Sequence, residues 1–356
     1  MASPLTTPTE PDATAGAPPE RQAVLRQVCD LVRARRSFLV TTHRAPDGDG
    51  IGTGTALANL LAALGKEVVC YDVDPVPYTL RFLPGADRWV QALPPGKSFD
   101  ATFVVDTGDV ARCFPPGAPV PLHRLGVKVL VDHHLTQKPF ADVELLDVDA
   151  AANGLQVWDL VRALDVALTR DVALGIYVSI LADTGNFRYS STDPRALRAA
   201  AAMVDAGVDP WEVTVHLHES HPAARWRLLG RVLETLAVSS DGLCASLLVR
   251  RAWVEDALAG AGPGQESNLT DGFVNYARAI VGVEVAVELS EADADATRWR
   301  ASFRSRGGVN VARVAETFGG GGHHNAAGVE LSGTLDEVRE RVHAAVRAAM
   351  QEAGLG

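Results

Sequence analysis

Short apolar runs that end abruptly in charged residues recur along the first half of the chain. The run 127–131 is followed at once by one carboxylate and two imidazoles, Asp132, His133 and His134. Such a run predicts a buried strand that delivers polar side chains at its carboxyl end, where open α/β sheets place their active sites. We therefore expect one active-site edge that also includes the residues after three similar runs, namely His43, Asp47, Asp49, Asp106 and Asp183.

Strands and helices alternate from about residue 20 to 205, and this order predicts a largely parallel, doubly wound α/β sheet. Glycines and Pro46 between residues 42 and 52 disfavour a regular helix, so the helix after the first strand is predicted to begin at Thr53. We expect strands at 38–42, 67–73, 101–105, 127–131 and 143–146, and helices at 21–35, 53–64, 151–164, 171–181, 194–206 and 211–218.

The composition changes at about residue 237, which predicts a second and smaller α/β domain. Its expected strands are 243–249, 283–289 and 298–305, and its expected helices are 269–280, 310–318 and 334–353. An amphipathic stretch at 223–236 carries the chain into it. The domains that we predict are a disordered tail at 1–19, a catalytic domain at 20–205, a helical connector at 206–236 and a substrate-binding domain at 237–356.

Charge and composition limit the classes of function. The formal net charge of −11 over 356 residues argues against a long nucleic-acid track, which needs a basic face. Short phosphate-bearing ligands remain compatible, because bound divalent cations reverse the local charge. The four cysteines are scattered without a CxxC pair, which favours reduced thiols. No signal peptide and no apolar run of about 18 residues is visible, so we expect a cytoplasmic protein.

The predicted edge has the ligand types of a two-metal site. Carboxylate oxygens suit Mg²⁺ or Mn²⁺, and the added imidazoles favour Mn²⁺. Two such ions about 3.5–4 Å apart stabilise both oxygens of an in-line phosphoryl displacement. Asp106, alone at the end of a middle strand, is the natural bridging ligand. Each motif taken singly also fits a turn or a helix cap, but four of them at strand or helix ends favour a metal site.

Two other polar groups need an interpretation. Glycines 319–322 precede His323, and the run is either a flexible linker or a pocket wall that lets a ligand approach the backbone. Strand and helix signals on both sides favour the wall. His216, His218 and His221 have no acidic partner except Glu219, and we interpret them as interdomain or surface residues.

The ordered motifs resemble those of the DHH phosphoesterase superfamily. The residues that carry the resemblance are His43-x-x-x-Asp47-x-Asp49, Asp106, Asp132-His133-His134 and Asp183, followed by Gly320-Gly321-Gly322-His323 and Ala326-Ala327-Gly328, which look like a DHHA1 substrate domain. The resemblance extends from about residue 20 to 345. The short two-domain layout is similar to NrnA-type nanoRNases and pAp phosphatases, and to stand-alone phosphodiesterases of cyclic-di-AMP or pApA.

This resemblance implies a role for each residue of the first domain. One metal would be held by His43, Asp47 and Asp106, and the other by Asp49, Asp106, His133 and Asp183. Asp132 would orient a ligand imidazole. His134 would contact the scissile phosphate or assist the leaving oxygen, so that Asp106, Asp132 and His134 form the catalytic set.

The resemblance also implies substrate contacts in the second domain. Arg304 and His323 would hold the phosphate of the far nucleotide beside Gly321 and Gly322, because the guanidinium fork suits phosphate oxygens. Arg278 is a weaker candidate for the same task. His324-Asn325 stands where relatives often have a pair similar to Pro-Lys, which leaves the substrate preference open.

The sequence therefore predicts a Mn²⁺-dependent phosphodiesterase, with Mg²⁺ as the alternative ion. It would degrade very short RNA or linear dinucleotides such as pApA to mononucleotides and dephosphorylate pAp. A cyclic-di-AMP phosphodiesterase and a nucleotide-binding module without hydrolytic activity are the alternatives, and charge disfavours a long-RNA exonuclease. The resemblance implies a homodimer. Cleavage polarity and base preference stay open.

Overall fold

The computed structural model describes residues 18–134, 138–260 and 269–355. The chain divides into two compact units, Met1–Ser220 and His221–Gly356. The boundary falls inside the stretch 206–236 that the sequence predicts as a connector, and the predicted tail lies almost entirely outside the described residues. Among the described residues, no helix combines the length and the apolar character that crossing a bilayer requires.

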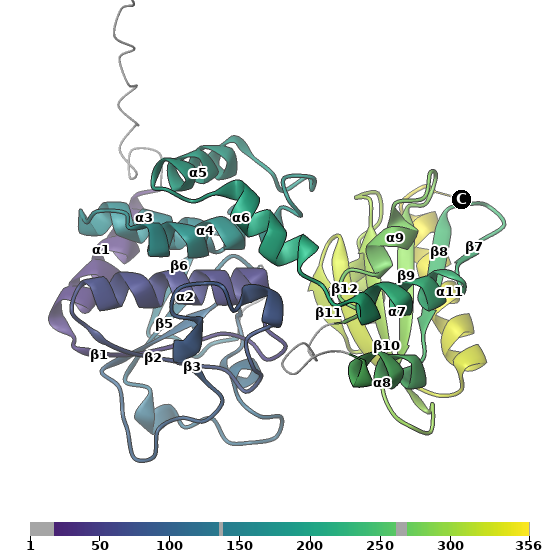
Figure 1. The fold of residues 1–356 in the computed structure, drawn as a ribbon, viewed down its shortest axis with the longest axis horizontal. Coiled ribbons are helices and arrows are strands. Elements are labelled where there is room, and N and C mark those ends of the chain that lie inside the picture. Colours follow the sequence, from purple (N-terminus) through teal and green to yellow (C-terminus); the bar gives the residue numbers. More distant parts are fainter. Residues whose placement is uncertain (1–17, 135–137, 261–268, 356) are drawn as a thin grey trace, which may run out of the picture. The chain divides into compact units, whose positions relative to one another are not determined.

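The first unit contains a six-stranded sheet in which every neighbouring pair is parallel (Figure 1). The strands are β1 (Ser37–Thr41), β2 (Glu67–Tyr71), β3 (Trp89–Val90), β4 (Ala101–Val105), β5 (Val127–Asp132) and β6 (Val143–Leu146). Their spatial order is β3-β2-β1-β4-β5-β6, so the order reverses between β1 and β4. The crevice at the carboxyl ends of strands beside such a reversal is where open α/β sheets bind ligands.

Helices cover one face of this sheet. They are α1 (Pro19–Ala34), α2 (Gly48–Ala63), α3 (Gly154–Leu164), α4 (Arg170–Asp183), α5 (Pro194–Asp205) and α6 (Pro210–Thr214). Phe38 and Val40 of β1 share a core with α1 to α5, whereas Leu39 points to the opposite face and packs with Phe114. This alternation is the period of two that strands impose on their side chains. The opposite face carries the 3-10 segments Val110–Cys113 and Leu122–Arg124, whereas Tyr78–Leu80 and Ala86–Arg88 contribute Leu80 and Ala86 to the core on the helical face.

The start of α2 differs from the prediction, because the helix begins at Gly48 and not at Thr53. Asp47 caps it by accepting the backbone amides of Asp49 and Gly50, at 3.0 and 3.1 Å, and a carboxylate in this position stabilises a helix start. The glycines that argue against a helix serve close packing instead. A Cβ on Gly52 would lie 2.7 Å from the carbonyl oxygen of Gly175 in α4.

The second unit contains a mixed six-stranded sheet in the order β11-β12-β10-β9-β8-β7, antiparallel except for β8 and β9. Its strands are β7 (Ala237–Val238), β8 (Cys244–Val249), β9 (Val285–Glu291), β10 (Arg298–Ser305), β11 (Gly321–His323) and β12 (Ala326–Ser332). Its helices are α7 (Ala223–Leu233), α8 (Arg251–Ala259), α9 (Val274–Arg278), α10 (Val311–Glu316) and α11 (Leu335–Glu352). The predicted parallel α/β domain and the smaller second α/β domain are both confirmed.

Two segments of the second unit depart from the prediction. Only residues 274–278 of the predicted helix 269–280 are helical, because Gly272 has a left-handed backbone with φ of 75° and interrupts the segment. Part of the glycine run is a strand, since Gly321 pairs with Gly328 in β12 and Gly322 pairs with Ala327. The run is therefore a structured element of the sheet.

Candidate metal centre

The residues that the sequence predicts as ligands come together at the carboxyl edge of the first sheet. His43, Asp106 and His133 follow β1, β4 and β5, which are adjacent strands. Asp47 caps α2, Asp49 lies in its first turn and Asp183 ends α4. Three groups have ligand atoms within 4.8 Å of one another, namely His43 with Asp47 and Asp106, Asp49 with His133 and Asp183, and Asp106 with His133 and His134.

Asp106 faces two histidines with different oxygens. Its Oδ2 lies 3.6 Å from Nε2 of His43, and its Oδ1 lies 3.5 Å from Nε2 of His133. The residue has a left-handed backbone with φ of 59° and is 3 % exposed. One buried carboxylate therefore belongs to two separate ligand groups, which is the arrangement that a bridging ligand requires.

The two histidines present the same ring nitrogen to this carboxylate. Nδ1 of His133 lies 2.9 Å from the carbonyl oxygen of Ala150, and Nδ1 of His43 lies 3.0 Å from that of Arg44. A carbonyl oxygen only accepts, so Nδ1 carries the hydrogen in each ring. In the neutral tautomer Nε2 then offers its lone pair to a cation, as ligand histidines do.

The electrostatics of the cluster favour bound cations. Burial lowers the pKa of His43, but interactions with Asp106 and Asp47 outweigh it and raise this pKa to about 9. Burial raises the pKa of Asp106, yet His133 and His43 hold it well below its usual range. Burial also raises the pKa of Asp49, and the charges of Asp106 and Asp183 add to that shift. Crowded carboxylates beside imidazole nitrogens fit a pair of divalent ions.

Asp132 and His134 form the side of the cluster next to Asp106. Oδ1 of Asp132 lies 2.7 Å from Nδ1 of His134, whose Nδ1 is also 3.8 Å from Oδ1 of Asp106. Burial lowers the pKa of His134, and the contact with Asp132 raises it above its ordinary value. Asp132 is fully buried, and the contact of its carboxylate with Nδ1 orients the imidazole ring of His134.

Three residues that hold Asp49 are not among the site residues that the sequence predicts. Thr53 and Ser179 donate side-chain hydrogen bonds to its carboxylate, and the backbone amide of Asn153 donates a third. The spacing in the sequence could have pointed to both hydroxyl residues, because each lies one helical turn from a predicted ligand. Thr53 follows Asp49 by one turn, and Ser179 precedes Asp183 by one turn.

The predicted substrate residues lie in the second unit. Arg304 of β10 pairs with Ala326 of β12, which in turn pairs with His323 of β11, so these three positions share one face of the sheet. The side chain of His323 lies outside the described residues. Ser302, Gly328 and Gly321 form the adjacent row across the same strands, while Arg278 ends α9, which packs against this sheet.

A buried carboxylate occupies the same sheet face. Glu288 of β9 pairs with Ser302 and is therefore diagonal to Arg304, within reach of a long side chain. The hydroxyl of Ser290 donates to it at 3.1 Å. Burial raises the pKa of Glu288 to about 7, although the charge of Arg304 opposes that shift.

The three histidines near the unit boundary make other contacts. The ring of His216 stacks on Phe82 at 4.3 Å, Nε2 of His218 lies 2.8 Å from Nδ2 of Asn186, and the ring of His221 packs edge-on against Trp226. His216 and His218 belong to a π-helical turn, Val215–Glu219. Among the described residues, none of the three belongs to a group able to hold a metal.

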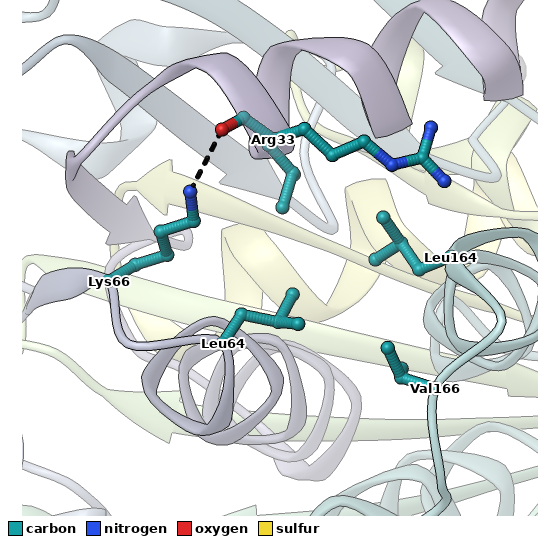
Figure 2. Close-up of a pocket in the computed structure, with 6 residues that line it drawn as sticks. Arg33, Leu64, Lys66, Leu164 and Val166 are labelled. Atoms are coloured by element: carbon teal, nitrogen blue, oxygen red, sulfur yellow. Dashed lines mark hydrogen bonds between the residues drawn. The ribbon is translucent and has the colours of Figure 1, made fainter.

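A separate hollow of about 250 Å³ lies among Arg33, Leu64, Lys66, Leu164 and Val166, which Figure 2 labels. Nζ of Lys66 donates to the carbonyl oxygen of Arg33 at its rim, 3.1 Å away. Arg33 and Lys66 precede β1 and β2, so the hollow lies at the amino ends of these strands, whereas the candidate ligands follow the carboxyl ends of β1, β4 and β5. It is lined by Val32, Arg33, Leu64, Lys66, Leu164 and Val166. It is therefore not part of the candidate centre.

The chain is similar in sequence to proteins of known families. Residues 37–180 match the N-terminal domain of the DHH family, and residues 255–352 match the DHHA1 domain. The bifunctional oligoribonuclease and PAP phosphatase NrnA of Thermus thermophilus is 37 % identical over 335 residues, which cover 93 % of this chain and 95 % of that relative. The chain belongs to the DHH family. The predicted resemblance is thus confirmed, and this DHH protein is a hydrolytic phosphoesterase.

Two further comparisons support the assignment at lower identity. The NrnA of Bacillus subtilis is 24 % identical over 304 residues, which cover 83 % of this DHH protein and 89 % of that relative. The crystal structure of an exopolyphosphatase-related protein from Bacteroides fragilis is 23 % identical with a TM-score of 0.83, and the match covers 94 % of this chain and 98 % of that one. At this identity the structural likeness concerns the fold.

Proposed function

We propose that this DHH protein is a manganese-dependent phosphoesterase for very short RNA and linear dinucleotides such as pApA, and that it also removes the 3′-phosphate of pAp. The names of two NrnA relatives, which combine oligoribonuclease and PAP phosphatase, support this choice of substrates. The formal charge of −11 supports short substrates over long RNA. The observation that carries the proposal is the pair of contacts from one Asp106 carboxylate to His43 and His133.

We propose two metal positions. His43, Asp47 and Asp106 would hold one ion. Asp49, His133 and Asp183 would hold the other, together with Asp106, whose Oδ1 lies 3.5 Å from Nε2 of His133. Divalent ions held in this way polarise a phosphoryl oxygen and lower the pKa of a coordinated water. The chain itself supplies the fixed spacing of the ligands, because Asp106 offers one oxygen to each group.

His134 is our candidate for the proton that the leaving oxygen needs. Asp132 contacts its Nδ1, and we propose that Nε2 of the same ring contacts the scissile phosphate or the leaving group. Burial lowers the pKa of His134, but the contact with Asp132 raises it above its ordinary value, which favours the protonated ring. A proton donor of this kind contributes typically 10²- to 10⁴-fold to a rate, roughly.

The second unit would hold the remainder of the substrate. Arg304 suits a phosphate through its planar fork of donors. Gly321 leaves room for a ligand, because a Cβ placed there meets no atom within 4 Å. We propose Arg304, Gly321, Gly322 and His323 for this contact, with Arg278 as a weaker candidate.

The proposal is tested by offering pApA, pAp, cyclic-di-AMP and a long single-stranded RNA to the purified chain with Mn²⁺. We expect turnover of pApA and pAp and little turnover of the long RNA. Faster cleavage of the long RNA contradicts the short-substrate proposal, and preferential cleavage of cyclic-di-AMP replaces it with the cyclic substrate. Tight binding of pApA without product over hours indicates a binding module instead of an enzyme.

The bridging role of Asp106 is tested with the variant Asp106→Ala, measured on the same substrates. Removing the shared ligand costs several kcal/mol of charge stabilisation, so turnover should fall by at least about 1,000-fold. Circular dichroism checks that the variant keeps its fold. Activity close to that of the wild type would rule out the bridging role of Asp106.

We also propose that the protein acts in the cytoplasm and as a homodimer, and that its physiological partners are short oligoribonucleotides, dinucleotides and pAp. The dimer rests on the resemblance to NrnA-type proteins. Sedimentation velocity at micromolar concentration tests it, and a single monomer peak contradicts it.

A further inference from the structure

The hydroxyl of Ser179 connects three helices at the buried side of Asp49. Ser179 lies in α4 and is fully buried, and its Oγ contacts Oδ1 of Asp49 in α2. The backbone amide of Gly154, the first residue of α3, donates to the same Oγ at 2.8 Å. An amide only donates, so the serine oxygen accepts from Gly154 and its single hydrogen points to Asp49. The direction of the hydroxyl is thus set by the backbone.

Close helix packing holds this serine in place. A Cβ on Gly52 would lie 2.9 Å from the backbone nitrogen of Ser179, and a Cβ on Gly154 would lie 2.5 Å from its Oγ. Separations below 3.0 Å force atoms to move. Glycine at both positions therefore allows α2 and α3 to approach α4 closely enough for the hydroxyl to reach Asp49.

Asp49 receives further donors on the same side. Thr53 Oγ1 lies 3.0 Å from its Oδ1, and the backbone nitrogen of Asn153 lies 2.9 Å from its Oδ2. The carboxylate is fully buried, and Oδ2 also faces Nε2 of His133 at 3.4 Å. Two hydroxyls thus engage Oδ1, which leaves Oδ2 as the oxygen that faces the ligand group with His133 and Asp183.

We infer that Ser179 is a positioning residue for the metal site of Asp49, His133 and Asp183, and that it acts by holding the Asp49 carboxylate in its ligating orientation. The inference rests on the proposed two-metal function. It extends that function by assigning a role to a residue that neither binds metal nor touches substrate. Hydrogen-bond partners of ligand carboxylates tune affinity because they fix the ligand before the metal arrives.

The test is a Mn²⁺ titration of the metal-stripped full-length chain by calorimetry and electron paramagnetic resonance. Ser179→Ala should weaken one of two sites by about 10- to 100-fold and leave the other unchanged. Thr53→Val removes the second hydroxyl without disturbing the Gly154 amide and should weaken the same site. Asp49→Asn identifies that site, because it should eliminate the same binding step.

Thr102→Val is the matched control, since Thr102 is also fully buried but donates to the carbonyl oxygen of Leu125. It removes a buried hydroxyl away from Asp49 and should leave both Mn²⁺ affinities at the wild-type values.

The inference is overturned if Ser179→Ala keeps both affinities, or weakens both sites equally. If Ser179→Ala does not fold, Thr53→Val decides by the same criteria. A wild-type chain that binds no Mn²⁺ overturns the proposed function as well, whereas two wild-type sites with an unaffected Ser179→Ala overturn only this inference.

Discussion

Oδ1 of Asp132 lies 2.7 Å from Nδ1 of His134 and accepts the backbone amide of His133 at 2.8 Å. A single buried oxygen therefore fixes both the turn after β5 and the ring of the second histidine. The amide of Gln156 donates to the carbonyl oxygen of Asp132 at 2.7 Å and steadies the strand end from α3. His133 is thereby directed toward the carboxylates of Asp49, Asp106 and Asp183, while the ring of His134 is held at Nδ1.

Replacing Asp132 by Asn tests whether the Asp132 carboxylate sets the pKa of His134. The contact with Asp132 opposes burial and raises the pKa of His134, so the neutral amide should lower that pKa. A proton donor loses activity as pH rises through its pKa, and the basic limb of the pH–rate profile should therefore move to lower pH. We expect kcat to fall by about 10- to 100-fold. A basic limb at the wild-type pH, measured on pApA, would contradict the proposed role of His134. The assay uses saturating Mn²⁺ as its control, because Asp132 also accepts the backbone amide of His133 and its replacement should weaken metal binding as well.

Arg304→Ala tests the proposed phosphate contact in the second unit. Hydrogen bonds to charged groups contribute roughly 1.5–3 kcal/mol, so KM for pApA should rise by about 10- to 100-fold with little change in kcat. Arg298→Ala is the control, because Arg298 lies on the same strand and face but binds Asp293 at 3.0 Å. Equal KM values for the two variants would argue that Arg304 does not contact substrate. The assay is steady-state kinetics with saturating Mn²⁺.

Substitutions at two neighbouring glycines, Gly321 and Gly322, distinguish an effect on substrate binding from an effect on stability. Gly322 has φ of 148°, and a Cβ there would lie 2.4 Å from the carbonyl oxygen of Ala326, so Gly322→Ala should destabilise the β11–β12 pair by about 1–3 kcal/mol. A Cβ on Gly321 meets no atom within 4 Å, so Gly321→Ala should keep the melting temperature and raise KM for pApA. Thermal unfolding and kinetics measure the two effects. An unchanged KM for Gly321→Ala would remove that glycine from the substrate site.

Glu288 should make stability fall as pH rises. Burial raises its pKa from the ordinary value of 4.5 to about 7 in the folded state, so between these values the folded chain binds more protons than the unfolded chain. The resulting stabilisation is complete below pH 4.5 and is lost as pH rises through about 7. Glu288→Gln should therefore stabilise the second unit at pH 8 by about 1–3 kcal/mol relative to wild type, with little gain at pH 5.

Denaturant unfolding of the full chain at the two pH values measures this difference. The control is Glu330→Gln, because Glu330 lies on β12 of the same sheet and is exposed. A stability gain of equal size at pH 5 and pH 8 would show that the carboxylate of Glu288 is not the titrating group.

Much of the candidate centre could be predicted because its signals are local in the chain. An apolar run that stops at Asp132, and another that stops at Asp106, place each carboxylate at a strand end whatever the strand's neighbours are. The alternation of strands and helices also indicates a parallel sheet, since parallel strands need crossover helices. The helix start predicted at Thr53 was wrong, because the helix begins at Gly48. The glycines that argue against a helix allow close contact with Gly175, which is far along the chain.

Residue types, their order and their positions at strand ends are thus properties of the linear chain. Tertiary structure decided which strands are neighbours, and with that which oxygen of Asp106 faces His43 and which faces His133. It also decided that Ser179, an unremarkable serine in an apolar helix, reaches Asp49 across 130 positions. The physical reason is that hydrogen-bond direction and carboxylate orientation depend on contacts between helices, and no local pattern of apolar and polar residues encodes them.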